Sequence, residues 1–154
     1  MLNPPKLIGH RGVKNLSPEN TLSSIELAHK LGLNWVEVDI KISQDLVPFL
    51  LHDDTLDRTT TGEGPPTNLN YNEIKKLDAG IFFYKHPTKI YVPTLHEVLI
   101  FCERNNMGLN IELKPNLGFE KKNVIAIAKL LKIFNFTNQY YFSSFDWNSI
   151  VMMK

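Results

Sequence analysis

Short apolar runs alternate with segments of helical periodicity along this chain, and this alternation restricts the fold more than any other feature. Extended runs are expected at residues 6–10, 35–40, 109–113 and 139–145. Apolar side chains recur at helical spacing in the connecting residues 22–31, 95–102 and 124–134. Strands joined through helices are typical of parallel sheets, because a parallel pair needs a long crossover. We therefore predict a parallel α/β fold.

Residues 53–92 interrupt this regular pattern, and a further extended run, residues 47–51, leads into them. They contain a Thr-Gly-Glu-Gly-Pro-Pro stretch that is typical of a loop, and a short helix is expected around residues 71–77. The pattern resumes at Thr94, which can form a capping box with Glu97. We interpret residues 53–92 as an excursion within one domain that covers residues 1–154.

Composition restricts the partners. The net charge is +1, which gives no overall basic field for nucleic acid or an anionic membrane. No apolar run is long enough to span a bilayer, and the N-terminus lacks the apolar region of a secretory signal. We expect a cytoplasmic protein that has no nucleic-acid partner and no stable membrane anchor.

Carboxylates occupy alternate positions in two of the expected strands. Glu37 and Asp39 share one strand face, and Glu112 shares a face with Lys114 on the later strand. Buried carboxylates repel one another and are costly to desolvate, and a divalent cation removes both penalties. Hard oxygen ligands favour Mg²⁺ or Ca²⁺. The alternative is a set of structural ion pairs, such as Glu112 with Lys114 or with Arg11.

Two histidines follow expected strands. His10 and Arg11 close the first strand, and His52 follows residues 47–51 with Asp53 beside it. Parallel α/β folds bind ligands beyond the carboxyl ends of their strands. Histidine can move a proton near neutral pH, and arginine can hold a phosphate with two parallel hydrogen bonds. These residues favour metal-assisted phosphate chemistry, with Asp53 orienting the His52 ring.

The ordered motifs resemble those of the glycerophosphodiester phosphodiesterases. They are Ile-Gly-His-Arg-Gly at residues 8–12, Pro-Glu-Asn-Thr at 18–21, Glu-Val-Asp at 37–39, Leu-His-Asp at 51–53, Leu-Asp-Arg-Thr-Thr at 56–60 and Glu-Leu-Lys at 112–114. The similarity runs from residue 7 to about residue 145. It implies a (β/α)₈ barrel of the TIM type, with residues 53–92 as a family-type insertion after the second barrel strand.

The resemblance also implies an activity and a set of roles. Members hydrolyse glycerophosphodiesters to glycerol 3-phosphate and an alcohol, in glycerophospholipid metabolism, with one divalent metal ion, Mg²⁺ or Ca²⁺. By motif, His10 and His52 would be the acid–base pair, in either order. The remaining residues that the motifs match are the metal ligands Glu37, Asp39 and Glu112, the phosphate contacts Arg11 and Lys114, and the supporting residues Glu19 and Asn20.

Length sets this chain apart from the family pattern. A (β/α)₈ barrel takes roughly 250 residues, whereas this sequence has 154. We therefore expect an incomplete barrel, roughly the N-terminal half of a C-terminally truncated member, that a second fragment or a homodimer would complete. Two alternatives to hydrolysis stay open: a non-catalytic remnant of such an enzyme, and a phospholipase D-like lyase that docks on lipid through Phe82, Phe83 and Tyr84.

Overall fold

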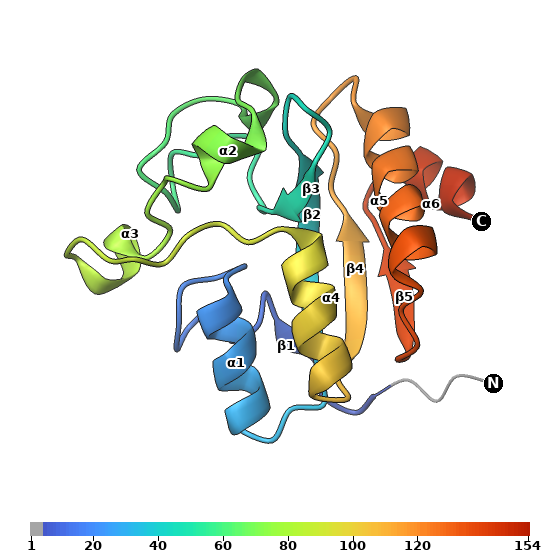
Figure 1. Cartoon of the computed structure of the whole chain (residues 1–154), viewed down its shortest axis with the longest axis horizontal. Coiled ribbons are helices and arrows are strands. Elements are labelled where there is room, and N and C mark those ends of the chain that lie inside the picture. Colours follow the sequence, from blue (N-terminus) through green and yellow to red (C-terminus); the bar gives the residue numbers. More distant parts are fainter. Residues whose placement is uncertain (1–4) are drawn as a thin grey trace.

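A parallel sheet forms the centre of the molecule in the computed structural model, which describes residues 5–154. Strands β1 (Gly9–His10), β2 (Trp35–Ile42), β4 (Gly108–Leu113) and β5 (Tyr140–Ser143) are parallel and adjacent in the order β1-β2-β4-β5 (Figure 1). The predicted parallel α/β fold is confirmed. Strands β1 and β5 are shorter than the runs predicted from the sequence.

One strand departs from the parallel pattern. Strand β3 (Pro48–Leu50) lies antiparallel to β2, with Ile40 opposite Leu50. Only residues 43–47 separate the two strands, and a parallel return needs a crossover of about a dozen residues or more. The chain therefore turns back as a hairpin, and this hairpin carries it into residues 53–92.

Helices cover one face of the sheet. Helices α1 (Leu22–Lys30), α4 (Leu95–Arg104) and α5 (Glu120–Phe134) run along the strands, and α6 (Trp147–Met153) lies beside α5 (Figure 1). The capping box of Thr94 and Glu97 at the start of α4 is present. Helix α5 begins at Glu120, before the predicted residue 124. The prediction missed its first turn because that turn is polar and carries no apolar periodicity.

Two hydrophobic clusters hold these layers together. The larger one lies between the sheet and its helices, and it includes Val36, Val38, Ile40, Ile111, Ile25, Val98, Leu99 and Ile127. The smaller one packs the insertion against β3, and it comprises Phe49, Leu51, Leu56, Tyr71, Ile74, Ala79 and Val92. The insertion therefore has apolar contacts of its own that fix it to the hairpin.

The insertion contains only short helices. A 3₁₀ turn (Pro66–Asn68) precedes α2 (Tyr71–Ile74), and α3 (Ile81–Tyr84) extends away from the sheet (Figure 1). Helix α2 is shorter than the helix predicted over residues 71–77.

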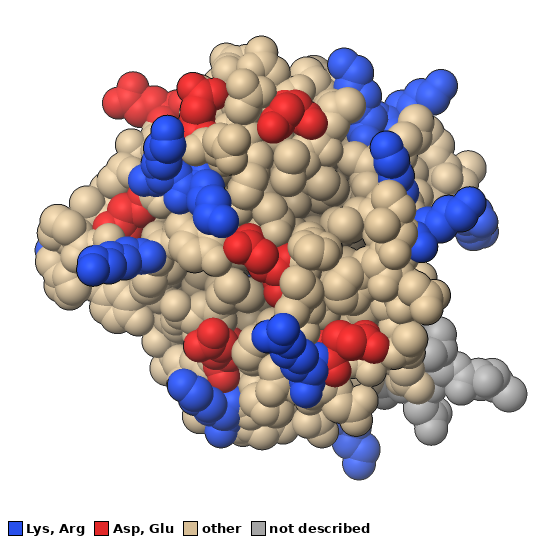
Figure 2. All heavy atoms as spheres, in the orientation of Figure 1, with Lys and Arg blue, Asp and Glu red and all other residues tan. Residues whose placement is uncertain are grey.

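None of the helices within residues 5–154 is long and apolar enough to cross a membrane. Basic and acidic side chains are interspersed over much of the face drawn in Figure 2.

The turn after β1 is fastened tightly to helix α1. Arg11 and Gly12 both have positive φ, 53° and 79°. The Ser24 hydroxyl donates to the Arg11 carbonyl at 3.0 Å and accepts from the Val13 N–H at 2.7 Å. A Cβ on Gly12 would lie 2.4 Å from Ser24 Oγ. This close approach fixes the loop that carries His10 and Arg11.

We expect Gly12→Ala to destabilise the protein more than Gly32→Ala. Both glycines have positive φ, but nothing lies within 4 Å of a Cβ on Gly32. The positive φ costs each alanine about 1–2 kcal/mol, and overpacking against Ser24 adds about 1–3 kcal/mol at Gly12 alone. Urea unfolding measures both variants. Equal losses would show that the contact with Ser24 does not constrain the turn.

Candidate active site

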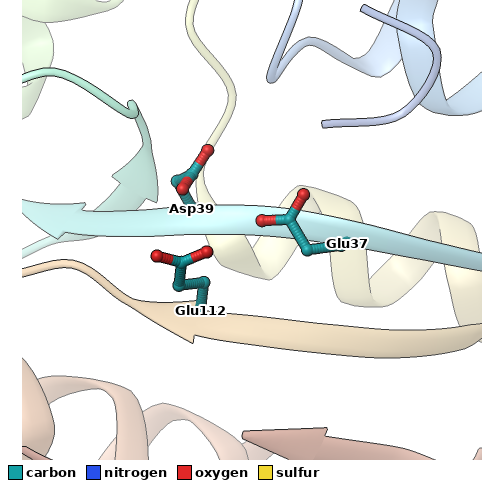
Figure 3. A group of neighbouring side chains, drawn as sticks. All are labelled: Glu37, Asp39 and Glu112. Carbon is teal, nitrogen blue, oxygen red and sulfur yellow. The ribbon is translucent and has the colours of Figure 1, made fainter. Parts of the chain in front are cut away.

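Three carboxylates from two neighbouring strands meet on the sheet face that the helices leave open. The register of β2 and β4 pairs Asp39 with Glu112, and Glu37 lies two positions before Asp39 on the same face. One oxygen from each carboxylate lies within 4.8 Å of the others (Figure 3). Asp39 is fully buried and Glu37 is 7% exposed. The sequence predicted this convergence from strand alternation.

The cluster is electrostatically strained. Burial and the nearby Asp39 carboxylate raise the pKa of Glu37 to about 7, although Glu37 Oε2 accepts a 2.9 Å hydrogen bond from the Arg11 backbone N–H. Glu37 Oε1 and Asp39 Oδ1 are buried without a hydrogen-bond partner. Glu37 thus keeps a buried oxygen with no partner, and three carboxylates that converge in this way suit a hard divalent cation, so the residues fit the expected metal.

Two cations flank the cluster. Lys114 Nζ lies 3.1 Å from Glu112 Oε1 and 3.3 Å from Asp39 Oδ1. Arg11 Nε lies 3.2 Å from Asp39 Oδ2. The alternative of a Glu112–Lys114 ion pair is therefore realised in the structure, whereas Arg11 pairs with Asp39 rather than with Glu112. Among the side chains of residues 5–154, the only possible ion-pair partner of Glu37 is His10, whose Nε2 lies 3.7 Å away. Ion pairing alone therefore does not account for all three acids.

Asn20 orients the Asp39 carboxylate. Its side-chain amide donates to Asp39 Oδ2 at 2.8 Å, and its carbonyl oxygen accepts from the Asp39 backbone N–H at 3.2 Å. Asn20 is buried and has a φ of 54°, a conformation that asparagine tolerates better than most residues. These contacts place Asn20 beside the cluster, and the supporting role that the family resemblance implied for it stays a prediction.

His10 lies at the rim of the cluster. Its ring is half exposed, and its Nε2 lies 3.7 Å from Glu37 Oε2. Burial lowers the pKa of His10, and the charges of Arg11 and Lys14 lower it further. The ring is therefore neutral at pH 7 and can accept a proton.

His52 is held by a carboxylate, as its sequence neighbour suggested. Its Nδ1 lies 2.7 Å from Asp53 Oδ1. A hydrogen bond from Arg58 lowers the pKa of Asp53 well below its usual range, against the effect of burial. An ionised carboxylate can only accept, so Nδ1 carries the proton of the neutral ring and Nε2 is left as the acceptor.

Two residues that had no predicted role lie beside these groups. Arg58 Nε donates to Asp53 Oδ2 at 2.6 Å, and its Nη2 donates to Glu19 Oε1 at 2.8 Å. Lys41 is fully buried, and its Nζ donates to Asp54 Oδ1 at 2.8 Å and to the Lys114 carbonyl at 3.0 Å. The alternation of Glu37 and Asp39 extends to Lys41 and could have indicated it. Arg58 lies in the insertion, where no periodicity points to it.

Comparison with known proteins connects this geometry to one family. The sequence matches the profile of the Glycerophosphoryl diester phosphodiesterase family over residues 10–154. It is 36% identical over 152 residues to a glycerophosphodiester phosphodiesterase of Caldanaerobacter subterraneus subsp. tengcongensis, covering 96% of this chain and 61% of the relative. It is 32% identical over 152 residues to a glycerophosphodiester phosphodiesterase of Bacillus altitudinis, covering 96% of this chain and 60% of that relative.

Solved structures give the same result. An Oleispira antarctica phosphodiesterase, in complex with the product sn-glycerol-3-phosphate, superposes with a TM-score of 0.89 at 39% identity, covering 96% of this chain and 60% of that one. A glycerophosphodiester phosphodiesterase from Agrobacterium tumefaciens gives 0.82 at 32%, covering 95% and 60%. This chain thus spans about 60% of the length of these relatives, and its fold is that of an incomplete TIM-type barrel.

The raised pKa of Glu37 predicts a pH dependence of the metal-free protein. Because the folded-state pKa of about 7 exceeds the ordinary 4.5, the folded state binds the proton more tightly. Folding stability therefore falls as the pH rises from 4.5 through 7, by about 3 kcal/mol in total. We expect Glu37→Gln in EDTA to remove this loss and to stabilise the protein at pH 8.

Urea unfolding at several pH values measures this effect, with Glu26→Gln on the exposed side of α1 as the matched control. The control should keep the pH slope of the wild type. A Glu37→Gln variant with the same slope as the wild type would contradict the prediction.

Proposed function

Because the chain belongs to the glycerophosphoryl diester phosphodiesterase family, we propose that it hydrolyses glycerophosphodiesters to glycerol 3-phosphate and an alcohol, with a divalent cation, Mg²⁺ or Ca²⁺, held by Glu37, Asp39 and Glu112. The observation that carries the proposal is the largely buried carboxylate cluster with two cations, Arg11 and Lys114, beside it. The Oleispira antarctica relative holds sn-glycerol-3-phosphate, which supports the same product here.

Arg11 and Lys114 bind the phosphate in this proposal. Both side chains lie at the carboxyl ends of strands and next to the cluster, within 3.3 Å of Asp39. A phosphodiester gains negative charge on its non-bridging oxygens in the transition state, and fixed cations stabilise that charge. The bound cation would supply Lewis-acid polarisation of a non-bridging oxygen.

His10 and His52 move the protons. One ring takes a proton from the nucleophile, which is water or a glycerol hydroxyl, while the other ring gives a proton to the leaving alcohol. His10 is neutral near pH 7, and His52 presents Nε2 because Asp53 holds Nδ1. His52 can therefore accept a proton at Nε2 and donate it from the same atom once protonated, and the neutral His10 ring can accept a proton.

Exposed aromatic side chains favour a second candidate, a lyase that acts on lipid head groups. Phe82, Phe83 and Tyr84 on α3 are 40–57% exposed, and Lys85 follows them. Aromatic and basic side chains together suit a lipid–water interface. A lyase would release a cyclic phosphate rather than glycerol 3-phosphate. Sedimentation with liposomes that is lost when all three aromatics become serine would favour this candidate.

We also propose that further strands close the sheet, from a second segment or a second copy of the chain. Within residues 5–154, β1 pairs only with β2 and β5 pairs only with β4. Light scattering of the purified chain measures whether it associates. The cytoplasmic location stays a prediction, and the alternative of a non-catalytic remnant is decided by the assay that follows.

We expect His10→Ala and His52→Ala each to reduce the hydrolysis of glycerophosphocholine by about 10²–10⁴-fold, because each variant removes a proton-transfer group. Release of glycerol 3-phosphate in the presence of Mg²⁺ or Ca²⁺ measures the rate, and EDTA should abolish it. His96→Ala, at an exposed position on α4 against Phe134, is the matched control and should keep the wild-type rate.

Activity that survives both substitutions would rule out this acid–base pair. A wild-type chain that binds the metal and releases no product would favour the non-catalytic remnant.

A further inference from the structure

Arg58 bridges two carboxylates, Asp53 and Glu19, that lie in different segments of the site. Its Nε and Nη2 donate to the two oxygens of Asp53 at 2.6 and 3.0 Å. Its Nη1 and Nη2 donate to the two oxygens of Glu19 at 3.0 and 2.8 Å. Each carboxylate is therefore held at both oxygens by one planar fork, which fixes the orientation of the carboxylates as well as their distance.

The two carboxylates hold different partners. Asp53 accepts from His52 Nδ1 at 2.7 Å, and Glu19 accepts from Arg11 Nη1 at 2.8 Å. Asp53 follows strand β3, whereas Glu19 lies in the segment between β1 and α1. Arg58 thus ties the carboxylate that carries His52 to a second anchor on the other side of the site.

The insertion is also held in place by apolar contacts that do not involve Arg58. The apolar cluster around Leu56, Ile74 and Phe49 already packs the insertion against β3. The Arg58 side chain is 49% exposed, and this exposure to solvent limits what its ion pairs contribute to global stability. The fourfold hydrogen bonding therefore indicates a task in orientation.

We propose that Arg58 is a positioning residue for His52: it fixes the Asp53 carboxylate against Glu19, so that Asp53 holds the Nδ1–H tautomer of His52 and presents Nε2 for proton transfer. This inference rests on the proposed hydrolase function. An imidazole whose other nitrogen is held by an oriented carboxylate keeps one tautomer and one ring direction. Without Arg58, Asp53 can rotate toward solvent, and the ring is free to change tautomer.

The test compares Arg58→Met, which keeps the length of the stem, with Arg58→Lys, which keeps the charge but has no fork. Arg104→Met, at an exposed position at the far end of α4, is the matched control. ¹⁵N NMR of histidine-labelled protein at alkaline pH reports the tautomer of each ring, and His52→Gln identifies the His52 signals. Turnover of glycerophosphocholine gives kcat and KM.

We expect the Nδ1–H tautomer of His52 to predominate in the wild type and in Arg104→Met, and to lose population in Arg58→Met. The corresponding kcat should fall about 10–100-fold, with a smaller change in KM. Arg58→Lys should recover part of both quantities.

An unchanged His52 tautomer in Arg58→Met would overturn the proposal, whatever the activity. An Arg58→Met variant that fails to fold would also overturn it, because Arg58 would then be a structural fastener of the insertion. A wild-type chain without turnover would contradict the proposed function alone, since the tautomer of His52 is read in the same protein without substrate.

Discussion

The parallel register between β2 and β4 is the constraint on which the rest of the structure depends. It places Asp39 beside Glu112 and leaves Glu37 one pleat away on the same face. Three carboxylates that are close together and largely buried destabilise the folded state, because they repel one another and lose hydration. The raised pKa of Glu37, about 7, reflects this destabilisation. The neighbouring cations and Asn20 relieve only part of it. A divalent cation bound by these carboxylates would remove this electrostatic destabilisation.

The other face of the same strands provides the stability that the acids remove. Val36, Val38 and Ile40 are fully buried against the helices, and the partner strand adds Ile111. Because side chains alternate along a strand, one short segment serves both the core and the site. A one-residue slip of β2 would exchange the two sets, so the apolar face also fixes the position of the acids. Packing and chemistry are therefore set by the same register.

The sequence predicted the features that follow from periodicity, and it failed where long-range contacts decide. Alternation identified Glu37, Asp39 and Glu112, and helical spacing identified the connections around the sheet. The antiparallel direction of β3 was not predicted, although the short link before it could have indicated a hairpin. Arg58 had no predicted role, because its partner Glu19 lies 39 positions away and nothing local reveals the pair. The full burial of Lys41 likewise depends on residues as distant as Lys114.

Three parts of the site are held by different forces: the carboxylate cluster, the turn that carries Arg11, and His52. This difference determines how precisely each part is placed. The register fixes the carboxylates, and backbone contact with Ser24 fixes the turn that carries Arg11. His52 depends on a chain of charged hydrogen bonds at the partly exposed edge of the insertion. Such bonds weaken with salt and open more readily than a packed strand. The insertion therefore positions His52, the part of the site whose geometry is easiest to change.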